Sequence, residues 1–140
     1  YSIFLRQSRD FEEKQSWTEM LKISQKAVDI EPHHAQGWFV HAKALQKTKQ
    51  VKEAFASYER ALFLDLSRKR TRLEYAQASI DFCSKHTCKS LSAHADMKKS
   101  VLDKGFSLYA QRFGDHEHLT PTGCAWIADL FASMILEPNP

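Results

Sequence analysis

The sequence predicts an all-α protein assembled from helical hairpins, with about seven helices in a single domain over residues 1–140. Only four glycines and four prolines occur, too few for a β-rich chain that needs a turn roughly every ten residues. Apolar residues recur at intervals of three and four, as one face of a helix requires. The first half of the chain also repeats itself at a fixed interval. These three observations favour stacked helices over sheets.

Length, charge and hydropathy argue against several classes of partner. A chain of 140 residues suits one domain that buries roughly two thirds of the surface exposed by the unfolded chain. The net charge of +3 is too small to indicate a nucleic-acid-binding face. No apolar run is long enough to cross a bilayer, and the start of the chain does not resemble a signal peptide. We therefore expect neither a membrane nor a nucleic acid as the partner.

The cysteine content points to a reducing compartment. Three cysteines is an odd number in a sequence that is not rich in disulfides, so we expect free thiols and a cytoplasmic location. Cys83 and Cys88 are close enough in sequence to pair in an oxidising setting, which is the alternative.

The most informative pattern is an internal repeat of 34 residues. In the second unit, Trp38, Ala42, Leu45 and Ala61 alternate between large and small side chains at helical spacing. The residues 34 positions earlier are Phe4, Ser8, Phe11 and Ala27, so large residues match large and small match small. The segments "AVDIEP" and "ALFLDL" close the two units at equivalent positions.

An early aromatic, a small residue four positions later, and the series Ala54-x3-Tyr58-x2-Ala61 resemble the tetratricopeptide repeat. The resemblance covers roughly residues 1–68, and it is close in 35–68 and weaker in 1–34. It implies a right-handed array of antiparallel helix pairs that acts as a scaffold for another polypeptide. The expected organisation is two repeats, 1–34 and 35–68, then a degenerate repeat or capping helix over 69–102 and a helical segment over 103–140.

Elementary packing explains the first two hairpins. Ala42, Ala54 and Ala61 would let the helix backbones approach closely, while larger apolar side chains fill the space between helices. Pro32 separates the hairpins, because proline ends one helix and suits the first turn of the next. A repeat cannot bury its apolar face alone, so a further helix is expected to cover the second hairpin.

The second half of the chain predicts three more helical stretches. Residues 70–86 place Leu73, Ala76 and Ile80 on one stripe, as a capping helix would. Residues 91–113 form a second stretch that we expect to be interrupted or bent near Gly105. The last helix follows Thr120, a suitable N-cap, with a proline at its first position.

The resemblance also implies a binding groove lined by the first helix of each repeat. The family's groove positions fall on one set of residues in the second and third units: Phe39, Lys43, Gln46, Arg70, Leu73 and Gln77. Their equivalents in the first unit are Leu5, Arg9 and Glu12. Lys43 and Arg70 could meet a carboxylate, and residues 68–72 form the densest cationic run. The expected partner is therefore a protein or peptide, with an acidic partner as one alternative and no cofactor or metal required.

A second motif, "GDHEHLTPTG" over residues 114–123, precedes the last apolar helix. Together with that helix (114–136) it resembles the final Asp-x-x-His-Leu-Thr-Pro-x-Gly block of the SGNH, or GDSL-type, hydrolases. The resemblance implies that His118 would be the general base and Asp115 its orienting carboxylate. The Gly-Asp-Ser block that carries the family's nucleophile and oxyanion donors is absent, and acyl transfer by this route needs both. The other interpretation is a polar loop before a capped helix.

Three functional hypotheses follow. The first is a protein-interaction module without catalytic activity of its own. The second is the C-terminal part of an ester hydrolase that carries repeats, which predicts a Gly-Asp-Ser block upstream in the parent reading frame; the chain begins at Tyr1 rather than Met. The third is a structural oligomerisation unit, which self-association in solution would distinguish.

Overall fold

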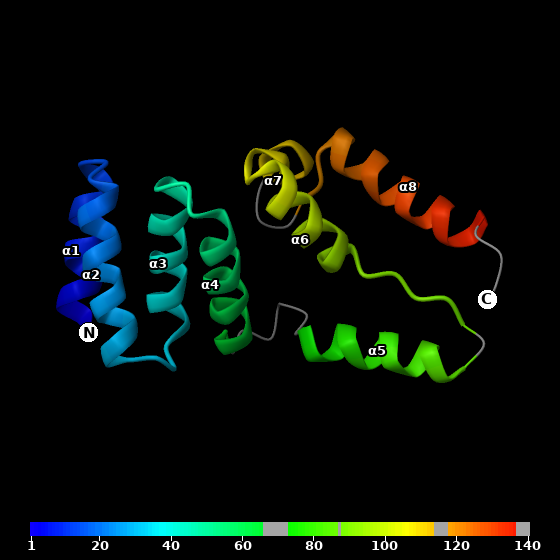
Figure 1. Cartoon of the computed structure of the whole chain (residues 1–140), viewed down its shortest axis with the longest axis horizontal. Helices are drawn as coiled ribbons and strands as arrows, with labels where there is room; N and C mark the ends of the chain where they lie inside the picture. Colours follow the sequence, from blue (N-terminus) through cyan, green and yellow to red (C-terminus); the bar gives the residue numbers. More distant parts are fainter. Residues whose placement is uncertain (66–72, 87, 114–117, 137–140) are drawn as a thin grey trace. The chain divides into compact units, whose positions relative to one another are not determined.

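The computed structural model describes residues 1–65, 73–86, 88–113 and 118–136, with the backbone alone at Leu73. This part of the chain is all-α, as predicted: it holds eight helices and no strand, with one isolated antiparallel bridge between Phe113 and Leu119 (Figure 1). The chain divides into two compact units, Tyr1–Arg70 and Thr71–Pro140.

The first unit consists of two helical hairpins. Its helices are α1 (Ser2–Glu13), α2 (Trp17–Ile30), α3 (Ala35–Lys47) and α4 (Val51–Leu64). Each helix packs against the next along the chain and α1 also contacts α3, while α2, α3 and α4 stand side by side (Figure 1). This is the hairpin array that the helical periodicity and the internal repeat predict.

The turns inside the two hairpins have the same backbone geometry, 34 residues apart. Gln15 and Lys49 both adopt the left-handed region, with φ of 54° and 64°. The next amide then bonds back across the helix end: Ser16 N donates to Phe11 O at 2.8 Å, and Gln50 N donates to Leu45 O at 2.9 Å. This is a Schellman helix ending, which satisfies carbonyls that the last turn would otherwise leave unpaired. The repeat therefore extends from side-chain pattern to backbone conformation.

Small side chains lie where the helices of the first unit cross. Ala42 and Ala54 are fully buried and Ala61 nearly so, which agrees with the spacing argument. The core beside these crossings is formed by Met20, Val40 and Ala44. Partly buried apolar side chains pack around that core: Leu5, Phe11, Trp17 and Leu21. The two hairpins thus share one apolar interior.

The second unit contains α5 (Leu73–Lys85), α6 (Ala93–Lys104), the short α7 (Ser107–Arg112) and α8 (Pro121–Leu136). The predicted interruption near Gly105 is confirmed, because Gly105 takes φ +84° and separates α6 from α7. The predicted N-cap is also confirmed: Thr120 Oγ1 accepts a hydrogen bond from the amide of Gly123 at 3.1 Å.

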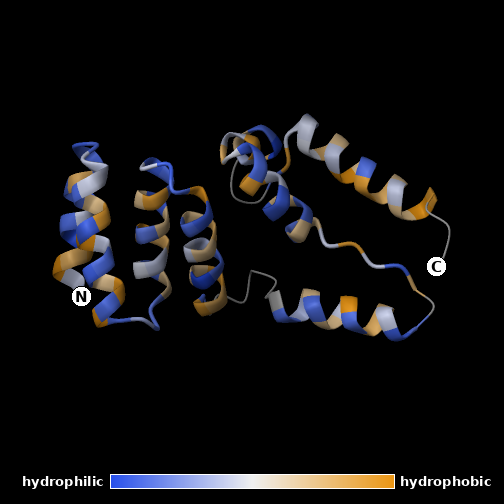
Figure 2. Ribbon diagram, viewed as in Figure 1, coloured by the Kyte–Doolittle hydropathy of each residue, from blue (hydrophilic) through white to orange (hydrophobic). Residues whose placement is uncertain are grey.

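The second unit buries less apolar surface than the first. Among its described residues, the buried apolar side chains are Met97 and Val101 of α6. Helix α8 is strongly apolar along its length, and its last turn leaves Ile135 and Leu136 69% and 81% exposed (Figure 2). In the described part of the chain, no helix has both the length and the hydropathy to span a membrane.

The expectation of three free thiols is wrong. Cys83 and Cys88 form a disulfide, with their Cα atoms 4.9 Å apart, whereas Cys124 is a free and exposed cysteine. The alternative pairing holds: α5 ends between the two cysteines, and the chain turns tightly after it, with Cys88 N donating to His86 O at 2.8 Å. A five-residue separation can close across such a turn.

Candidate functional site

Helices α1 and α3 bring together groove positions predicted in both hairpins. The ammonium group of Lys43 on α3 forms an ion pair and hydrogen bond with the carboxylate of Glu12 on α1. Both side chains remain about one-third exposed, at 35% and 34%. Such a pair contributes little stability at a solvated surface, but it neutralises the charge of both groups. Lys43 was predicted to bind a carboxylate of the partner. It already has a carboxylate partner within the chain, Glu12.

Phe39 and Gln46, the other predicted groove residues of α3, are both tied to Tyr58 of α4. The rings of Phe39 and Tyr58 meet edge to face, with centroids 5.7 Å apart. The hydroxyl of Tyr58 donates a hydrogen bond to Gln46 Oε1 at 2.7 Å. Even so, 47% of Phe39 is exposed, as is true of several large apolar residues of the chain, and what sets Phe39 apart is the hollow beside it. The aromatic pair is thus held in place while one ring stays open to solvent.

A hollow of about 450 Å³ lies over this pair, between α3 and α4. Its lining is Phe39 and Gln36 with six further residues: His34, Ala35, Tyr58, Ala61, Leu62 and Asp65. The groove prediction missed the residues of α4, because it considered only the first helix of each hairpin. The aromatic, aliphatic and polar groups that converge here make the hollow the candidate site of the first unit.

The repeat register explains why this face is open. Tyr58 and Leu62 of α4 are the counterparts, 34 residues later, of Ser24 and Val28 of α2. Ser24 and Val28 are buried, and Ser24 contacts His41 of the next hairpin with Oγ 3.2 Å from Nδ1. The first hairpin thus uses this face to hold the second, whereas the same face of the second hairpin forms the hollow. The register could have identified Tyr58 and Leu62 from the sequence.

The third-unit part of the predicted groove is only partly described. Arg70 and the side chain of Leu73 lie outside the described residues, as does the cationic run over 68–72. Gln77 is exposed on α5, and its Nε2 donates a hydrogen bond to Asp81 Oδ1 at 2.8 Å. The structure therefore places three of the six predicted residues, Phe39, Lys43 and Gln46, on one surface, and the contribution of the others stays a prediction.

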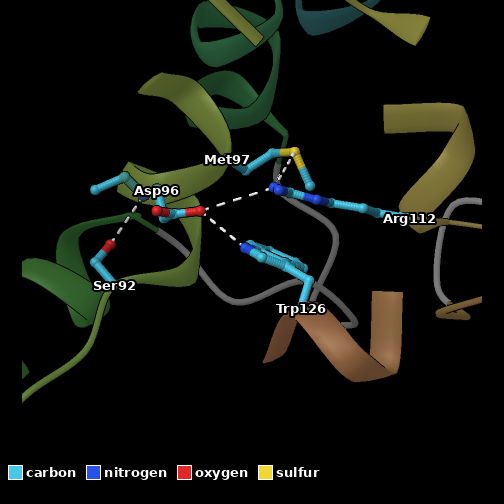
Figure 3. Close-up of polar contacts among 6 residues, drawn as sticks. Ser92, Asp96, Met97, Arg112 and Trp126 are labelled. Atoms are coloured by element: carbon cyan, nitrogen blue, oxygen red, sulfur yellow. Dashed lines mark hydrogen bonds and ion pairs between the residues drawn. The ribbon is translucent and has the colours of Figure 1, made fainter. Parts of the chain in front are cut away.

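In the second unit, Asp96 of α6 links α7 and α8. Its Oδ2 accepts a hydrogen bond from Trp126 Nε1 at 2.8 Å and lies 3.7 Å from Nη1 of Arg112 (Figure 3). The guanidinium carbon of Arg112 also lies 4.4 Å from the centroid of the Trp126 ring, a cation–π contact. Because the three side chains satisfy one another, the cluster holds the helices together rather than presenting an unpaired group to a ligand.

The structure assigns local roles to the Leu-Thr-Pro-x-Gly part of the hydrolase-like motif. Thr120 caps α8 and its amide donates to Arg112 O at 2.9 Å, while Pro121 occupies the first helical position. A side chain at Gly123 would collide with the carbonyl oxygen of Arg112. His118 is exposed, and Asp115 lies outside the described residues, so their proposed pairing stays untested.

Comparison with known proteins assigns no family. No protein-family model matches the chain, and no curated protein or solved structure is significantly similar to it. The functional conclusion therefore rests on the residues and their geometry.

His41 of α3 is a buried ionisable group of the first unit. Burial lowers its pKa below the ordinary value of 6.5, and the nearby charge of Asp29 offsets only part of this effect. Ser24 has one hydroxyl proton and contacts both Leu21 O, at 3.1 Å, and the His41 ring. When Ser24 donates to that carbonyl, the Nδ1–H group of His41 donates to Ser24.

We expect the first unit to lose stability as the pH falls below about 6.5, because the unfolded state then binds a proton that the native His41 rejects. Above the unfolded pKa both states are neutral at this site, so His41 adds no pH dependence there. Urea unfolding at about pH 7.5 and about pH 5.5 measures the difference. His41→Gln should reduce it, and the exposed His33→Gln should not. An equal pH dependence in His41→Gln and the parent would contradict this assignment.

Proposed function

We propose that the first unit is a pair of tetratricopeptide-type repeats that binds a segment of another protein, with Phe39 as the central contact. The exposure of this ring over the hollow between α3 and α4 is the observation that carries the proposal. The 34-residue recurrence of both the sequence pattern and the left-handed turns supports the repeat type. In this reading the chain is an interaction module without catalytic activity of its own.

The lining indicates what the partner segment must provide. Phe39, Tyr58 and Leu62 offer ring and aliphatic surface that would take a large apolar side chain. Gln36 is exposed beside them and can both donate and accept hydrogen bonds, which suits a partner backbone. Aromatic residues commonly dominate binding energy at such surfaces because they bury a large area with few rotatable bonds. We therefore propose a peptide segment, extended or helical, that is anchored by an apolar residue.

Lys43 gives no support to the alternative of an acidic partner. Lys43 is paired with Glu12, so it does not present an unpaired positive charge to the partner. Any acidic preference must then come from Arg70 and the rest of the run over 68–72. We propose a cytoplasmic setting on the basis of the odd cysteine number; in that compartment the Cys83–Cys88 bond would have to be reversible, because persistent disulfides are rare there.

The proposal is tested with peptides that are selected from a random display library for binding to the 140-residue chain. We expect Phe39→Ala to weaken binding of a selected peptide by at least about tenfold, the size typical of a central aromatic contact. Fluorescence anisotropy with the labelled peptide gives the dissociation constant of each variant.

Phe63→Ala is the matched control, because Phe63 is 43% exposed in the same unit but does not line the hollow. Its dissociation constant should stay within about twofold of the parent. If Phe63→Ala weakens binding as much as Phe39→Ala, the selected surface is not the hollow. Failure to enrich any peptide over an unfolded control of the same chain would also count against the proposal.

A further inference from the structure

The disulfide lies at the junction between α5 and the extended segment that leads to α6 (Figure 1). Cys83 belongs to the last turn of α5 and is half-buried, whereas Cys88 follows the helix and is exposed. The bond therefore fixes the start of the extended segment to the end of the helix. Cys88 is therefore the more accessible of the two cysteines to a reagent in solution.

The residue after Cys88 connects this junction to another helix. Lys89 Nζ donates hydrogen bonds to two main-chain carbonyls of the last turn of α8, Met134 O at 2.8 Å and Ile135 O at 3.4 Å. The final carbonyls of a helix lack intrahelical donors and carry partial negative charge, so an ammonium group stabilises them. Lys89 thus acts as a cationic C-cap for α8.

In the described part of the second unit, Lys89 links the segment that follows α5 to the end of α8. Helix α6 packs on α7 and α7 on α8, but in the described part of that unit α5 makes no comparable contact with any of them. The position of Lys89 depends on the segment that the disulfide anchors. The oxidation state of the cysteine pair can therefore influence how firmly the end of α8 is held.

We propose that Cys83–Cys88 is a reversible thiol–disulfide exchange site for a dithiol reductant, and that its reduction releases the Lys89 cap from α8. A thiolate of the reductant attacks Cys88 Sγ, and the Cys83–Cys88 bond breaks with its electron pair on Cys83 Sγ, which takes a proton from water. The second thiol of the reductant then attacks the mixed disulfide and displaces Cys88 as a thiolate. The protein gains two electrons and the reductant becomes a disulfide.

Release of the cap matters because the last turn of α8 is apolar and exposed. Ile135 and Leu136 are the most exposed large apolar residues described in the chain. In the oxidised protein their helical turn is completed by Lys89, whereas in the reduced protein it would fray more often. The exchange site would thereby control how often the apolar last turn of α8 is helical.

The experiment uses the full chain, oxidised with glutathione disulfide or reduced with dithiothreitol. Maleimide labelling and mass spectrometry should find one reactive cysteine in the oxidised protein, Cys124, and all three cysteines after reduction. Hydrogen–deuterium exchange should show amides in the last turn of α8 exchanging about two- to fivefold faster after reduction, the size expected for loss of a charged cap.

Matched variants distinguish loss of the Lys89 cap from a general loss of stability in the second unit. Lys89→Met should give the faster exchange already in the oxidised protein and should not respond further to reduction. Cys124→Ser, which leaves the pair intact, should respond as the parent does. Exchange at the end of α8 that is unchanged by reduction would overturn the proposal, and so would three reactive cysteines after oxidation. Because the parent protein is compared with itself, the result does not depend on the folding of any variant.

Discussion

Replacing Met20 with alanine is expected to lower the free energy of unfolding of the first unit by about 2–4 kcal/mol. Met20 is fully buried, and it packs with Val40 and Ala44 where the two hairpins share their core. Truncation would remove apolar contacts and leave a cavity between α2 and α3, because both backbones are held by the surrounding helices. Urea unfolding followed by the fluorescence of Trp17, which packs on the same core, measures the loss.

Ile3→Ala is the control for Met20→Ala. Ile3 is an apolar residue of the same unit, but it is 58% exposed on α1. Its truncation should change the free energy of unfolding by no more than about 0.5 kcal/mol. Equal losses in the two variants would mean that the Met20 side chain does not lie in the shared core, and the hairpin packing described above would then be wrong.

Replacing Gly123 with alanine is expected to destabilise the second unit by about 1–3 kcal/mol through overpacking. The new Cβ would lie 1.9 Å from the carbonyl oxygen of Arg112, a main-chain atom that cannot rotate away. Relief requires α8 to move away from the end of α7, which would strain the hydrogen bond between Trp126 and Asp96. Hydrogen–deuterium exchange of α7 and α8 should therefore rise by about 5- to 160-fold, the equivalent of that free energy.

Gly105→Ala separates crowding from backbone strain. A Cβ at Gly105 meets no atom within 4 Å, but φ of +84° is unfavourable for any residue with a side chain. We expect Gly105→Ala to lower the free energy of unfolding of the second unit by about 1–2 kcal/mol. Amide exchange should then rise at the break between α6 and α7 rather than in α8. Faster exchange of α8 in Gly105→Ala than in Gly123→Ala would contradict the close approach at Gly123.

Features that depend on nearby residues were predictable from the sequence. The helices follow from apolar spacing, and the break at Gly105 follows from a residue that alone tolerates its φ without penalty. Thr120 and Pro121 mark the start of α8, since capping and proline preferences act within one turn. The internal repeat predicted the burial of Ala42, Ala54 and Ala61, because the crossings recur at a constant spacing, whereas Ala44 is buried without having been singled out.

Part of the candidate site was also predictable, but its character was not. The family resemblance placed Phe39 and Gln46 in the expected groove; Tyr58 contacts both, but only Phe39 lines the hollow. Lys43 was expected to receive a partner's carboxylate, but it is neutralised by Glu12, 31 residues earlier. Spacing alone does not reveal such a pair, since it depends on how closely α1 and α3 approach.

The sequence by itself determined the helical class, the repeat, the helix break and the cap of α8, because each depends on interactions within a few residues of chain. Only the tertiary structure decided that Cys83 pairs with Cys88, that Lys89 caps α8, and that residues of α3 and α4 line one hollow beside Phe39. These features need atoms from separate elements to meet at distances of a few ångströms. Their positions are fixed by the packing of whole helices, which no local preference encodes.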